Sequence, residues 1–121
     1  MSVLTLAACL VHTFAGDKEL RRIEPEQGTN TLKQETWTMA RCGWHWISYD
    51  LLLATIVLFL LNFTTIIENR RNTLLFMQVF FFGYALVWLL TIRFSKPFAK
   101  NYIKLCQWLL LLTIALLIHF S

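Results

Sequence analysis

The chain has 121 residues, of which 57% are hydrophobic and only 15% are charged. A water-soluble domain usually has about 25% charged residues, so this composition argues against one. The net charge of +4 comes from basic residues dispersed at the ends of apolar stretches. This excludes the clustered basic and aromatic surface of a nucleic-acid-binding protein and fits contact with anionic lipid instead.

Four long stretches of the chain carry no charged residue. A bilayer core about 30 Å thick needs roughly 20 apolar helical residues. Each stretch reaches that length when interfacial aromatic or basic residues at its ends are included. We therefore expect an all-α fold over residues 1–121, a single domain in which four transmembrane helices form a bundle. Their approximate spans are 2–20, 44–67, 72–92 and 101–120.

The first apolar stretch is also short enough to be a secretory signal peptide. No Lys or Arg precedes it, and the residues around Thr13 and Ala15 make a poor cleavage site, which favours a retained helix. Such a helix can cross the bilayer if it continues through Asp17 to Arg22, with the long basic side chains reaching up to the headgroups.

The second helix is expected to begin before the membrane. Thr31 and Gln34 have the spacing of a capping box, in which two side chains satisfy the free amides of a helix start. Apolar residues then recur every three or four positions, which is typical of one helix face. We expect an amphipathic helical lead-in over 32–43 and a continuous helix from near Leu32 to near Glu68, extended on the cytoplasmic side.

Basic residues in the connecting loops predict the orientation of the helices. The first and third loops together carry nine Lys and Arg residues, whereas the second carries two. By the positive-inside rule, loops one and three are cytoplasmic and both termini are non-cytoplasmic. We expect this membrane to be a bacterial inner membrane. Ser95 and Pro97 in the third loop have the pattern of a helix start.

Polar residues inside the first two helices suggest a site. They are costly in lipid and usually face the interior of a bundle. They recur at helical spacing in two sets, which are Ser2, Thr5, Cys9, His12, Gly16 and Glu19 in helix one, and His45, Ser48, Thr55 and Asn62 in helix two. One interpretation is close helix packing with hydrogen bonds across the contact.

The other interpretation is a polar site at the cytoplasmic ends of these helices. His12 and His45 are expected at similar depth, with Glu19 at the mouth of the site, and Ser48 and Asp50 are further candidates for it. Two such histidines could ligate haem, bind a metal ion or relay a proton. His119 ends helix four on the far side of the membrane and cannot join them.

Enzyme signatures are absent from the sequence. It contains no G-x-S-x-G, no Gly-rich phosphate loop, no H-E-x-x-H and no C-x-x-C. We predict no catalytic residue and expect a non-enzymatic accessory subunit or a small oligomeric transport component, acting as a homo-oligomer or in a larger membrane complex. The alternative is a redox protein that binds haem or a metal ion through His12 and His45.

Two short motifs resemble those of a family of small, uncharacterised bacterial membrane proteins of about this length. They are His-x-x-x-Gly in the first helix (His12, Gly16) and Trp-His at the entry to the second (Trp44, His45), with Glu19 and Pro25 between them. The resemblance covers roughly the first half of the chain. It implies a four-helix integral membrane protein and supplies no activity, substrate or cofactor.

Overall fold

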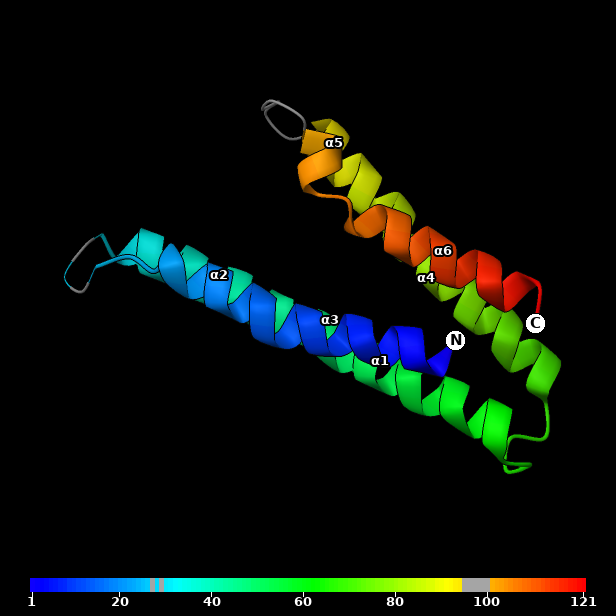
Figure 1. Cartoon of the computed structure of the whole chain (residues 1–121). Helices are drawn as coiled ribbons and strands as arrows, with labels where there is room; N and C mark the ends of the chain where they lie inside the picture. The colour runs from blue at the N-terminus through cyan, green and yellow to red at the C-terminus, as the bar shows by residue number, and fades with distance from the viewer. Residues whose placement is uncertain (27, 29, 95–100) are drawn as a thin grey trace. The chain divides into compact units, whose positions relative to one another are not determined.

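The structure is a computed structural model that describes residues 1–26, 28, 30–94 and 101–121. These residues form helices and connecting segments without a strand, which confirms the all-α prediction (Figure 1). Contacts divide the chain into two compact units, Ser2–Phe63 and Thr64–Ser121, the latter grouped with Met1. The predicted helix start at Ser95 and Pro97 lies outside the described residues.

The first unit is a hairpin of two long helical rods. Helix α1 (Ser2–Leu10), the π-helix η1 (Val11–Gly16) and α2 (Asp17–Arg22) follow one another without a break and run antiparallel to α3 (Thr31–Phe63) (Figure 1). Small side chains let the two backbones approach closely. The buried side chains of this contact are Ser2, Thr5, Ala8 and Cys9 on α1 and Ser48, Leu51, Ala54, Thr55, Leu58 and Leu61 on α3.

Helix α3 begins where the sequence predicts, but with a different cap. Asn30 precedes it, and its side-chain Oδ1 accepts a hydrogen bond of 2.9 Å from the amide of Leu32. The predicted cap, Thr31, is instead the first helical residue. The reason is that Asn is at least as good an N-cap as Thr and stands one position earlier.

The predicted end of this helix near Glu68 is wrong, because α3 ends at Phe63. Four β-branched residues follow, Thr64, Thr65, Ile66 and Ile67, and such residues propagate a helix poorly. The next helix then takes its own cap, since Asn69 Oδ1 accepts a 3.3 Å hydrogen bond from the amide of Asn72.

The second unit pairs α4 (Arg70–Phe94) with α6 (Gln107–His119), preceded by the short α5 (Asn101–Lys104). Its buried residues are Met77, Phe81, Ala85 and Ile92 on α4 and Ile114, Ala115 and Ile118 on α6. The sequence predicts one helix over 101–120, but the chain turns at Leu105 and Cys106. There the Trp88 indole nitrogen donates a 3.2 Å hydrogen bond to the carbonyl of Leu105, which stabilises the interruption.

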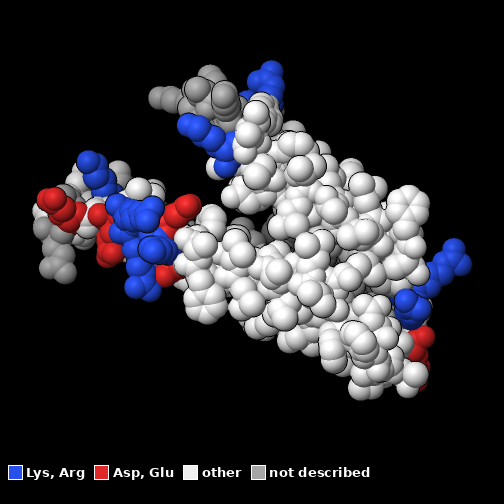
Figure 2. All heavy atoms as spheres, in the orientation of Figure 1, with Lys and Arg blue, Asp and Glu red and all other residues white. Residues whose placement is uncertain are grey.

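Two helices among the described residues, α3 and α4, are long and apolar enough to cross a membrane. Helix α6 is apolar but has 13 residues, which rise only about 20 Å. Large apolar side chains are exposed along α1, α3, α4 and α6. On the face that Figure 2 shows, charged side chains gather at the ends of each unit and the surface between them is uncharged.

Candidate functional site

The π-helix η1 sets which residues of the first rod face α3. A π-helical turn has i to i+5 bonding instead of i to i+4, so it shifts the helix register by one residue. His12 and Asp17, which are five residues apart, consequently both reach side chains of α3. Extending the α-helical spacing selects Glu19, which is exposed in the structure, whereas Asp17 is the acidic residue that contacts α3.

Gly16 and Trp44 form a close contact between the two rods. Gly16 is buried, and a Cβ atom built on it would overlap the Trp44 indole. The same indole stacks on the His12 imidazole, with 4.1 Å between ring centroids and 6° between the planes. Its nitrogen donates a 2.8 Å hydrogen bond to the carbonyl of His12. The His-x-x-x-Gly and Trp-His motifs therefore meet as one packing unit.

Ser48 links His12 to α3. The Ser48 hydroxyl donates to the carbonyl of Trp44 at 3.3 Å, so at His12 it accepts, and His12 Nδ1 donates over 3.0 Å. This assignment leaves the other imidazole nitrogen, Nε2, with a lone pair. That atom is buried and has no hydrogen-bond partner among the described residues. Cys9 Sγ also lies 3.5 Å from the carbonyl oxygen of Ser48.

Asp17, which follows His12 by five residues on the same rod, is the centre of an ion-pair cluster. Its Oδ1 accepts a 2.8 Å hydrogen bond from Arg41 Nε and its Oδ2 accepts a 2.8 Å bond from Arg21 Nε. Arg41 Nη2 adds a second contact at 3.2 Å, and His45 Nε2 lies 3.2 Å from Oδ1. The Asp17 side chain is only 12% exposed, so nearly all its hydrogen-bonding capacity is used within the hairpin.

Trp37 holds the Arg41 side chain in this cluster. The guanidinium carbon lies 5.5 Å from the Trp37 ring centroid, within cation-π range, and the Trp37 indole nitrogen donates a 3.0 Å bond to the carbonyl of Leu20. The Asp17 carboxylate beside it raises the pKa of Arg41 above its usual value. Arg41 is therefore a permanent cation fixed to the first rod.

The two histidines of the predicted polar site have different partners. His12 bonds Ser48, whereas His45 contacts Asp17, so a site shared by both histidines stays a prediction. Asp50 lies two residues beyond Ser48 on α3, and side chains at that spacing do not share a helix face. Of the second polar set, Ser48 and Thr55 are buried against the first rod.

Asp17 and Arg41 are the residues that sequence reasoning missed. The spacing of Asp17 and Arg21, four residues apart, is a sequence signal for an ion pair on one helix face. The approach of Arg41 could not be seen without the η1 register shift. Among the described residues, no three His, Cys, Asp or Glu side chains are grouped so as to hold a metal ion.

Comparison with known proteins adds no assignment. No family model matches the chain, and neither the curated proteins nor the solved structures contain a significant match. The resemblance suggested by the His12 and Trp44 motifs consequently stays a prediction.

Proposed function

We propose that this chain is an integral membrane protein with four membrane-crossing helical segments, serving as a non-enzymatic subunit of a membrane complex or of a homo-oligomer. One observation carries the proposal. Each unit is a helical hairpin with large apolar side chains exposed between charged ends. Apolar surface costs about 25 cal/mol per Å² in water, so lipid or a partner helix is the expected covering.

The geometry of the polar cluster supports a holding role over a catalytic one. Asp17 is bonded by Arg21 and Arg41 and touched by His45, which leaves little of its surface for a substrate. Polar groups that satisfy one another across a helix contact fix helix register and orientation in a membrane. We infer that the cluster clamps the first hairpin at its polar end.

The outward face of α3 supports association with a partner. Trp46, Tyr49, Leu53 and Phe63 are all exposed on this helix. Two-helix hairpins have no interior in which to enclose a transport path, so a transport role would need several copies or a second protein. We therefore include in the proposal that several copies of the chain, or the chain and a second protein, associate into a helix bundle.

Membrane extraction followed by cross-linking tests this function. After expression of the full chain, membranes are washed with alkaline carbonate and then treated with an amine-reactive cross-linker, which Lys18 and Lys33 can accept because both are exposed. We expect the chain to stay in the membrane pellet and to appear as a cross-linked species larger than the monomer. Release into the wash would contradict membrane insertion, and monomer alone would contradict the subunit role.

A redox or metal-binding function is the second candidate, favoured by the buried, unpartnered Nε2 of His12. A haem or metal ion shared with His45 fits less well, since His45 Nε2 is turned to Asp17. A visible spectrum and metal analysis of protein purified in mild detergent decide the matter. A haem spectrum or stoichiometric metal that disappears in His12→Phe would establish this function. A colourless, metal-free protein would remove it.

A further inference from the structure

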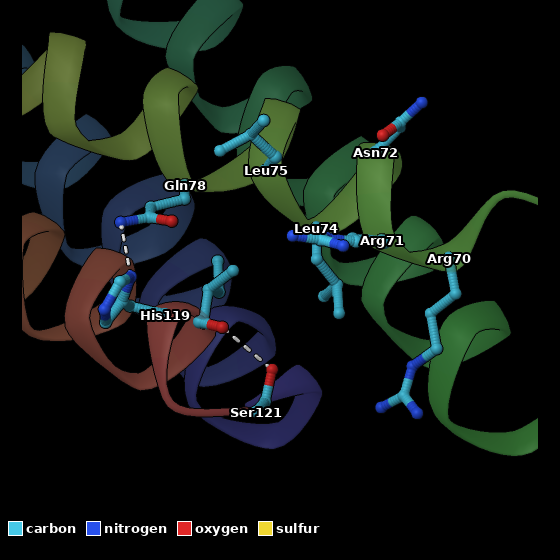
Figure 3. Close-up of a pocket in the computed structure, with 9 residues that line it drawn as sticks. Arg70, Arg71, Asn72, Leu74, Leu75, Gln78, His119 and Ser121 are labelled. Atoms are coloured by element: carbon cyan, nitrogen blue, oxygen red, sulfur yellow. Dashed lines mark hydrogen bonds between the residues drawn. The ribbon is translucent and has the colours of Figure 1, made fainter.

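A pocket of about 570 Å³ lies in the second unit, where α4 begins and α6 ends (Figure 3). Arg70, Arg71 and Gln78 line it from α4, and His119 lines it from α6. Leu75 and Ile118 supply an apolar wall. The pocket thus combines basic and amide groups with hydrocarbon at one end of an apolar helix pair.

The charged groups of this pocket are all cationic. No Asp or Glu lines it, and neither Arg70 nor Arg71 forms an ion pair with any residue that the structure describes. Arg21 and Arg41 in the first unit, by contrast, both form an ion pair with Asp17. The two guanidiniums at the start of α4 are available to an anion from outside the chain.

Neutral N–H donors in the pocket also favour an anionic ligand. Gln78 Nε2 donates a 3.2 Å hydrogen bond to His119 Nδ1, as the dashed line in Figure 3 shows. With Nδ1 as acceptor, the imidazole proton is on Nε2, so the ring also presents an N–H group. Guanidinium groups with additional N–H donors match the oxygens of a phosphate group.

We propose that this pocket binds the headgroup of an anionic phospholipid through its phosphate, an inference that rests on the membrane insertion proposed above. The ends of membrane helices lie at headgroup depth, where arginine forms charge-assisted hydrogen bonds to phosphate oxygens. Leu75 and Val79 are exposed one turn apart on α4 and continue the apolar wall away from the arginines. That stripe accommodates an acyl chain, which free phosphate lacks.

Native mass spectrometry of the full chain in a non-ionic detergent tests the proposal. Phosphatidylglycerol and phosphatidylcholine with the same acyl chains are titrated separately, and inorganic phosphate is titrated alone. The test variant is Arg70→Gln with Arg71→Gln. The matched control is Arg93→Gln, which removes an exposed cation from the other end of the same helix.

We expect phosphatidylglycerol to bind more tightly than phosphatidylcholine. Each of the two arginines that line the pocket should contribute about fivefold to the affinity there, so the double variant should lose roughly 25-fold for phosphatidylglycerol. Its affinity for phosphatidylcholine, its helix content and the lipid binding of the Arg93 control should stay within about twofold of the parent. Inorganic phosphate should bind much more weakly than phosphatidylglycerol.

Three results would overturn the inference. These are equal binding of the two lipids, an unchanged preference in the double variant, or phosphate binding as tight as that of phosphatidylglycerol. Alkaline extraction distinguishes a failure of the lipid-binding proposal from a failure of the proposed membrane function. A chain that stays in the membrane but lacks the lipid preference refutes only the pocket, whereas a chain released by carbonate refutes membrane insertion itself.

Discussion

Replacing Gly16 by alanine should destabilise the first hairpin, because the new methyl group would overlap the Trp44 indole. Overpacking a close contact costs about 1–3 kcal/mol. Alanine also gains up to about 1 kcal/mol over glycine inside a helix, which offsets part of that cost. The matched control is Gly43→Ala on α3, where a Cβ would meet no atom within 4 Å. Both variants gain helix propensity, so the overpacking cost should account for most of the difference between their stabilities.

The assay is reversible unfolding in detergent micelles, followed by helical circular dichroism as a denaturing detergent is added. Gly16→Ala should unfold about 1–3 kcal/mol more easily than Gly43→Ala. In the Gly16→Ala background, Trp44→Phe removes part of the indole and should recover some of the loss. Equal stability of the two alanine variants would refute the close contact and, with it, the arrangement of the candidate site.

Three further substitutions test other contacts. Asn30→Ala should cost about 1 kcal/mol and speed amide exchange in the first turn of α3, since Asn30 is the cap; a larger effect of Thr31→Ala would contradict this. Ser48→Ala should cost about 1–3 kcal/mol by leaving His12 Nδ1 unpaired, and a neutral result in the same unfolding assay would disprove that bond. Arg41→Gln should lower the melting temperature more than Arg21→Gln. The Arg41 side chain is 30% exposed and makes two contacts with Asp17, whereas that of Arg21 is 63% exposed and makes one. A larger effect of Arg21→Gln would contradict the cluster geometry.

Much of the fold follows from hydropathy. The start of α3 is recovered to within a residue, because capping chemistry and apolar periodicity agree there. The end of α3 and the break before α6 are not recovered. Each depends on weak local preferences and, at Leu105, on one hydrogen bond from a residue 17 positions away.

Helical spacing selects His12 and Ser48 separately as members of the polar site, and the structure joins them by a hydrogen bond. Their pairing was not predicted, because His12 lies in the π-helix η1. Beyond η1 the α-helical extrapolation selects Glu19, whereas the structure places Asp17 against α3. A π-helical turn has no sequence signature strong enough to be read from Val11–Gly16 alone, so the acidic residue at the centre of the cluster could not be predicted.

The central claim, that the chain crosses a membrane four times, is tested most directly by reporter fusions at three positions. An alkaline phosphatase domain, which is active only outside the cytoplasm, is placed at Gly28, at Asn69 and after Ser121. The basic residues of the loops predict activity at Asn69 and after Ser121 and none at Gly28. Equal activity at all three positions would contradict the account.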